Sequence, residues 1–141
     1  MIKNYFNNIK EGYIIIADLG EEKDHKQGGI RPVLVISNNI GNRFSPLLKI
    51  IPFTTQKQNK NLPTHVKYKA GEGNLPEDSV LLAESTIDIN KSQIKYIVGK
   101  FSEQQMDRAM VGMAMATPCM IRAFKNGVQN TDIFKKIAMA M

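Results

Sequence analysis

Short apolar runs recur along the first two thirds of the chain, and polar, turn-rich pieces separate them. The runs cover residues 13–17, 33–36, 47–53, 80–83 and 96–98, with Gly and Asn gathered at 28–29, 38–42 and 71–74. Runs of this length, rich in Val and Ile and bounded by Gly and Asn, predict β-strands. Residues 65–69 alternate polar and apolar side chains, which predicts a further strand with one wet face. Because no helical pattern interrupts them, these strands favour a small antiparallel barrel over a parallel sheet.

Two prolines and a change from strand-like to helix-like spacing of the apolar residues refine this prediction. Pro52 lies inside an apolar run and cannot donate to a ladder, so it predicts a sheet edge or a bulge. Ser102 and Gln105 have the spacing of a capping box and predict a helix that begins after Ser102. The apolar stripe that follows is interpreted as core packing and consists of Met106, Ala109, Met110, Met113 and Ala116. Pro118 predicts the end of this helix or a kink, with further helical pieces at 119–125 and after residue 131.

Composition is that of one globular domain. The chain has 141 residues, of which 43% are apolar and 23% charged, so we expect residues 1–141 to form a single domain, with a barrel at about 10–100 and a helical region at about 102–141. One cysteine and two histidines leave too few ligands for a disulfide framework or a zinc cluster, and we expect no metal and no cofactor. Without a long apolar run or an apolar leader, the sequence predicts a soluble, cytoplasmic protein with no membrane partner.

The positive charge is concentrated in one stretch. The formal net charge is +6, and residues 31–71 contain seven of the 19 basic residues and no Asp or Glu. The remaining 12 basic residues face all 13 acidic ones elsewhere in the chain. Such a stretch indicates either a solvated face or a surface that binds a polyanion, which would be nucleic acid or an acidic partner.

Two segments within this stretch carry candidate chemistry. Arg31 stands at the start of an apolar strand, directly after the Gly28–Gly29 pair. A diglycine forms tight turns and also lets backbone N–H groups approach an anion closely. Thr54, Thr55 and Gln56 end another apolar run, and strand ends on a rigid scaffold often carry function. A rim ion pair for the arginine and ordinary strand threonines remain the plain alternatives.

The order of several motifs makes the chain resemble the MazF/PemK family of toxin ribonucleases. The motifs are IADL at 16–19, QGGIRPVLVISN at 27–38, GNRFSP at 41–46, PFTTQ at 52–56, LPTHV at 62–66 and DSVLL at 78–82. The resemblance implies an SH3-like antiparallel barrel with C-terminal helices, as in MazF and CcdB toxins. It also implies a homodimer and an acidic antitoxin as partner.

The resemblance further implies sequence-specific cleavage of single-stranded RNA without a metal. The functional arginine of the family falls on Arg31 and its functional threonine on Thr54. The other residues that we expect to contact RNA are His25, Lys26, Gln27, Gly28, Thr55, Gln56, Lys57, Lys60 and Glu84. The sequence departs from the usual family pattern at Lys26, where an acidic residue is usual, at 85–87, and after Pro118.

Physical chemistry assigns roles to these residues. Cleavage by the 2′-hydroxyl builds negative charge on the phosphorane, which the planar, permanently charged Arg31 would stabilise. Thr54 would bind the phosphate or orient the hydroxyl, and His25 is the nearby residue whose ordinary pKa suits proton transfer. A weakly catalytic RNA-binding module and a gyrase-directed poison on the same scaffold are the competing hypotheses.

Overall fold

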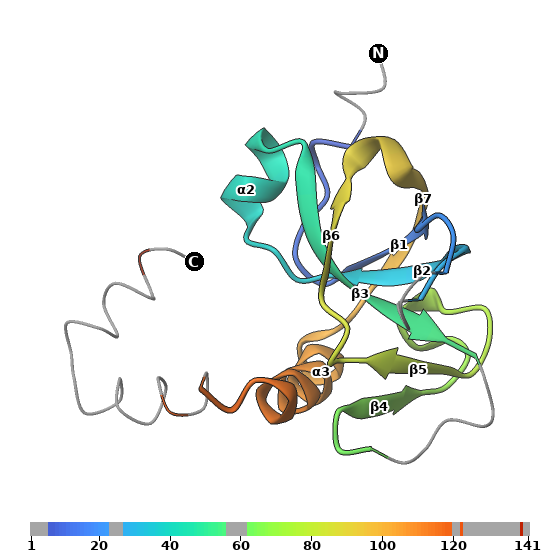
Figure 1. Cartoon of the computed structure of the whole chain (residues 1–141), viewed down its shortest axis with the longest axis vertical. Coiled ribbons are helices and arrows are strands. Elements are labelled where there is room, and N and C mark those ends of the chain that lie inside the picture. The colour runs from blue at the N-terminus through green and yellow to red at the C-terminus, as the bar shows by residue number, and fades with distance from the viewer. Residues whose placement is uncertain (1–5, 23–26, 56–61, 120–121, 123–138, 140–141) are drawn as a thin grey trace.

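The computed structural model describes residues 6–22, 27–55, 62–119, 122 and 139. Its elements run in the order β1 (Tyr13–Asp18), β2 (Ile30–Val35), α2 (Asn39–Phe44), β3 (Leu47–Thr54), β4 (His65–Tyr68), η1 (Glu72–Asn74), β5 (Ser79–Leu82), β6 (Ile87–Asn90), η2 (Lys91–Gln93), β7 (Ile94–Lys100) and α3 (Glu103–Ala116). The strands pair in the order β4-β5-β3-β2-β1-β7, and β6 pairs with the first half of β3. All of these pairings are antiparallel, which confirms the predicted fold class (Figure 1).

The sheet is buried on both faces, so its central strands read as continuous apolar runs. Val33 and Val35 of β2 enter one core and Leu34 enters the other, because successive side chains of a strand point to opposite faces. The first core is completed by Phe6, Ile9, Ile15, Ala17, Leu48, Ile50, Ile89 and Ile94. The second core consists of Ile14, Leu34, Ile51, Phe53, Tyr68, Leu75, Leu81, Phe101 and Ala109, and α3 covers it. The two cores hold β2 and β3, the strands that carry the candidate site, rigidly between them.

Pro52, for which the sequence predicted a sheet edge or a bulge, does not lie in an edge strand. Pro52 is buried in β3, a central strand, where it pairs with Val33 of β2. On its other side β3 pairs with β6 up to Ile50 and with β5 only from Phe53 onward. The proline therefore lies in the gap between two ladders, where the N–H that it lacks is not required.

The helix α3 begins and ends as predicted. The Ser102 side chain accepts a hydrogen bond from the Gln105 N–H, and the Gln105 side chain accepts one from the Ser102 N–H, which completes the capping box. The helix ends at Ala116, one residue before the Thr117–Pro118 pair. The helical pieces predicted at 119–125 and after residue 131 fall largely outside the described residues.

The predicted apolar stripe of α3 is partly wrong. Met106 and Met113 pack on the second core and Ala109 is fully buried, but Met110 is 48% exposed. Gly112 is buried instead, because α3 approaches the sheet so closely that only a residue without a side chain fits there. Among the described residues no helix is long and apolar enough to cross a membrane.

Candidate active site

Arg31 and Thr54 lie on neighbouring strands. β2 and β3 pair as far as Val33 and Pro52, and the same register continued by two residues places Arg31 opposite Thr54. The Nη1 atom of Arg31 donates a hydrogen bond to the Phe53 carbonyl oxygen at 3.3 Å. The two residues that the sequence proposed as catalytic are therefore brought together at the ends of two buried strands.

The Arg31 guanidinium is held from one side by neutral acceptors. Its Nε donates to the Gly28 carbonyl oxygen at 2.8 Å, and Nη1 donates to Oε1 of Gln27 at 2.7 Å. None of the ion pairs among the described residues involves Arg31. Partial burial lowers its pKa, and the charge of Glu22 opposes this shift. Because an arginine pKa starts above 12, the group stays charged.

The anchoring leaves donors for a ligand. A guanidinium carries five N–H donors, of which one is on Nε and two are on each Nη. The hydrogen bonds above use Nε and Nη1, and within the described residues Nη2 donates to no acceptor. A fixed, half-buried cation with two free donors suits the oxygens of a phosphate.

Gly28 shapes the site through its own backbone. A side chain at Gly28 would collide with the main chain of Glu21 and Glu22, so glycine is required there by close approach. Gly29 has a φ of +79° and its N–H donates to the Gly20 carbonyl oxygen. The diglycine thus forms the turn that aims the Gly28 carbonyl at Arg31.

The threonines differ in exposure. Thr54 is buried, with 5% of its surface exposed, whereas Thr55, the residue after β3, is exposed. His25, Lys26, Gln56, Lys57 and Lys60, which we predicted to contact RNA, lie outside the described residues. Their placement beside Arg31 remains a prediction.

Glu84 lies apart from Arg31 and forms a second pair with a residue that the sequence analysis missed. Its Oε2 lies 3.0 Å from Nε2 of His65, whose side chain is 9% exposed. Thr54 pairs with Val80 at the start of β5, and Glu84 follows the other end of that strand. Residues 83 and 84 form a turn after this strand, which the hydrogen bond from the Ser85 N–H to the Leu82 carbonyl oxygen closes. The only sequence signal for His65 was its position in the LPTHV motif.

The basic stretch is partly neutralised. Lys49 pairs with Asp88 at 3.0 Å, and both side chains are exposed. Lys67 and Lys69 are exposed at β4, and neither side chain takes part in an ion pair with a described residue. No group of three or more His, Cys, Asp or Glu among the described residues is arranged to hold a metal ion.

Solved structures share this architecture and identify its class. The crystal structure of MazF from Deinococcus radiodurans superposes with a TM-score of 0.65 at 20% identity, covering 76% of this chain and 94% of that chain. A mycobacterial endoribonuclease in complex with its cognate antitoxin gives a TM-score of 0.63 at 22% identity, covering 77% and 93%. The fold is that of the MazF-type toxins.

Sequence comparison shows the family. The PemK-like, MazF-like toxins of type II toxin–antitoxin systems match residues 10–112, and this protein belongs to that family. Endoribonuclease EndoA of Bacillus subtilis strain 168 is 40% identical over 100 residues, which cover 71% of this chain and 86% of the relative. Endoribonuclease MazF of Staphylococcus saprophyticus is 33% identical over 98 residues, covering 70% and 82%.

Proposed function

We propose that this protein is an endoribonuclease toxin that cleaves single-stranded RNA at specific sequences in the cytoplasm. The observation that carries the proposal is the Arg31 guanidinium, which neutral acceptors anchor through Nε and Nη1, while Nη2 donates to no acceptor among the described residues. The relatives named endoribonucleases support the same activity.

The proposed reaction needs no metal because the RNA supplies its own nucleophile. The 2′-oxygen bonds to the adjacent phosphorus and the bond from phosphorus to the 5′-oxygen breaks, which leaves a 2′,3′-cyclic phosphate and a 5′-hydroxyl. The 2′-hydroxyl proton goes to a base, for which His25 is the candidate, and the 5′-oxygen takes up a proton. Arg31 stabilises the charge that develops on the phosphorane oxygens, and Thr54 orients the phosphate.

The other residues that we expect to contact RNA lie on both sides of Arg31 and Thr54 in the chain. Gln27 and Gly28 position Arg31, while Thr55, Gln56, Lys57, Lys60 and Glu84 contact the RNA strand on either side of the scissile phosphate. From its family, we expect the protein to form a homodimer with a second copy of this chain and to bind an acidic antitoxin. One solved neighbour is an endoribonuclease bound to its antitoxin, and the basic stretch would attract an acidic chain.

Incubation of the purified protein with single-stranded RNA in EDTA tests the proposal. Products that end in 2′,3′-cyclic phosphate and 5′-hydroxyl support it, and cleavage should be much slower in Arg31→Ala. RNA that is bound but intact would favour the weakly catalytic RNA-binding module. If the protein neither binds nor cleaves the RNA, the gyrase-directed poison is the remaining hypothesis. Inhibition of purified gyrase would then support it.

A further inference from the structure

The helix α3 lies close against the sheet at Gly112. A methyl group added there would lie 2.6 Å from Cγ2 of Val66, 3.2 Å from Cβ of Ala83 and 3.4 Å from the Thr64 carbonyl oxygen. Glycine in a helix interior is unfavourable in itself. The position therefore reflects packing, since the backbone of α3 rests directly on β4 and on the end of β5.

The residues that Gly112 approaches are the chain neighbours of His65 and Glu84. Thr64 and Val66 stand on either side of His65, and Ala83 precedes Glu84. The Ala83 N–H donates to the Thr64 carbonyl oxygen at 3.1 Å, which joins the two segments. The three atoms nearest to Gly112 thus belong to the backbone neighbours of the pair.

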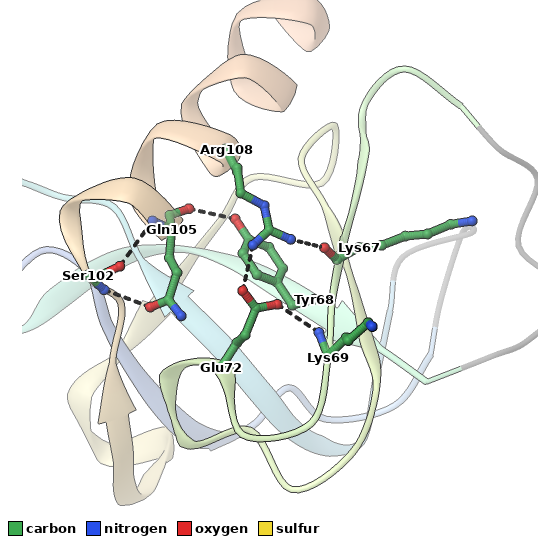
Figure 2. Close-up of polar contacts among 7 residues, drawn as sticks. All are labelled: Lys67, Tyr68, Lys69, Glu72, Ser102, Gln105 and Arg108. Carbon is green, nitrogen blue, oxygen red and sulfur yellow. Dashed lines mark hydrogen bonds and ion pairs between the residues drawn. The ribbon is translucent and has the colours of Figure 1, made fainter.

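One turn before Gly112, Arg108 fixes α3 to the far end of β4 (Figure 2). Its Nη1 lies 2.5 Å from Oε1 of Glu72, and its Nη2 donates to the Lys67 carbonyl oxygen. The guanidinium also lies over the Tyr68 ring, 4.4 Å from its centre. Glu72 in turn accepts from the Lys69 N–H at 2.8 Å, so side chains occupy the Lys67 carbonyl oxygen and the Lys69 N–H at this end of the edge strand.

A second contact from the same helix holds Tyr68. The Tyr68 hydroxyl donates to the Gln105 carbonyl oxygen at 2.8 Å. Residues 105, 108 and 112 lie on one face of α3, so the helix contacts β4 along the length of the strand. Any displacement of α3 must then shift β4, and His65 with it.

We infer that α3 is a buttress that sets the position of the His65–Glu84 pair, and that Gly112 and Arg108 are positioning residues for RNA recognition at Glu84. The part of this inference that concerns RNA rests on the proposed function. Neither residue touches the reacting atoms, and the chemistry at Arg31 does not depend on them. Their effect therefore belongs to substrate binding.

Gly112→Ala tests the inference, with Val66→Ala as a compensating change. Because valine is stiff at χ1, the added methyl must push α3 away from β4. We expect the KM for a short RNA to rise roughly 10-fold while kcat stays within about 2-fold. The double variant Gly112→Ala/Val66→Ala removes the colliding methyl groups and should restore the KM. Arg108→Lys keeps the charge but loses the planar fork, and should raise the KM in the same way.

Ile94→Val is the matched control. Ile94 is buried in the first core, on the face of the sheet away from α3, and belongs to β7, at the opposite end of the strand order from β4. This variant should lose thermal stability without a change in KM. All variants are compared at a temperature at which circular dichroism finds each one folded.

A readout without RNA separates this inference from the proposed function. The chain has two histidines, so the imidazole nitrogen resonances of His65 can be assigned with His65→Asn. Gly112→Ala should shift the His65 Nε2 resonance and the double variant should return it, even if the wild type cleaves no RNA. An unchanged resonance in Gly112→Ala, or a KM increase that Ile94→Val reproduces and Val66→Ala does not relieve, overturns the inference.

Discussion

Arg31 reaches across the sheet to Phe53: its Nη1 donates to the carbonyl oxygen of the residue that directly precedes Thr54. This bond ties the cation of β2 to the end of β3 and fixes the distance between the two proposed catalytic residues. Since Phe53 is buried in the second core, the orientation of the guanidinium is set by packing before any ligand binds. Preorganised charge of this kind lowers a barrier because no reorganisation is needed when charge develops.

Removal of the guanidinium should abolish most of the catalysis. We expect Arg31→Ala to lower kcat by roughly 10²–10³, the loss typical of one preorganised donor. Arg31→Lys should also be impaired, because a single ammonium cannot bond Gly28 and Gln27 and still present two donors to a phosphate. Cleavage is measured with a short RNA under single-turnover conditions. Far-UV circular dichroism should be unchanged, and a melted Arg31→Ala would show instead that the residue is structural.

A one-atom change at Gln27 tests whether the free charge of Arg31 matters. Oε1 of Gln27 accepts from Nη1 at 2.7 Å, so Gln27→Glu would turn this bond into an ion pair with little change in shape. We expect cleavage to fall roughly 10-fold, since the carboxylate compensates the charge that the phosphate needs. Thermal stability should be kept or increased. Undiminished cleavage by a folded Gln27→Glu would contradict the electrostatic role.

Lys57 and Lys60 should determine much of the salt dependence of RNA binding. Each phosphate contact in a single strand contributes roughly −0.7 to the slope of log K against log salt. Lys57→Gln/Lys60→Gln should therefore reduce the slope by about 1.4. Lys49→Gln is the control, because Lys49 already pairs with Asp88. Equal slopes in the wild type and the double variant would remove these lysines from the interface.

The features that the sequence predicted correctly are those that depend on residues close together in the chain. The strand runs, the capping box of Ser102 and Gln105 and the end of α3 before Pro118 depend on residues close in the chain, and the structure confirms them. Burial of both sheet faces follows from runs such as Val33–Val35 without alternation. Fold class and family were therefore accessible from the pattern and from the order of motifs.

The features that the sequence did not predict depend on the register between strands and on the close approach of α3 to the sheet. The bond from Arg31 to Phe53 spans 22 residues, and the His65–Glu84 pair spans 19, so both needed the pairing of strands to be known. Met110 was misplaced because the line of contact on α3 runs through Gly112, where the absence of a side chain draws the helix inward. A hydrophobic pattern does not mark a glycine as a contact residue.

Burial of Tyr68 should be visible in a titration. Desolvation by burial raises the pKa of Tyr68 to about 12, from an ordinary value of 10.0, although the charge of Arg108 opposes the shift. The folded state thus favours the neutral phenol. Its contribution to stability is complete below pH 10.0 and is lost as the pH rises towards 12.

The measurement is the phenolate absorbance as a function of pH, in the wild type and in Tyr68→Phe. The variant should lack the step at highest pH. It should also unfold more easily at neutral pH by about 1 kcal/mol, because it loses the hydrogen bond to the Gln105 carbonyl. A Tyr68→Phe curve that still contains the late step would show that another tyrosine produces it.

Glu72 should make the contact between α3 and β4 sensitive to acid. Hydrogen bonds from the Arg108 side chain and the Lys69 N–H hold the pKa of Glu72 below its ordinary value of 4.5, with a smaller opposing effect of desolvation. A lowered carboxyl pKa stabilises the folded state fully above pH 4.5, and this stabilisation disappears as the pH falls through the lowered value. Urea unfolding of the wild type and Glu72→Gln between neutral and acid pH should therefore give curves that converge below pH 4.5. Glu77→Gln, at an exposed position outside the ion pairs of the described residues, should keep the wild-type dependence. Parallel curves for the wild type and Glu72→Gln would mean that the carboxylate contributes nothing to the hold of Arg108 on β4.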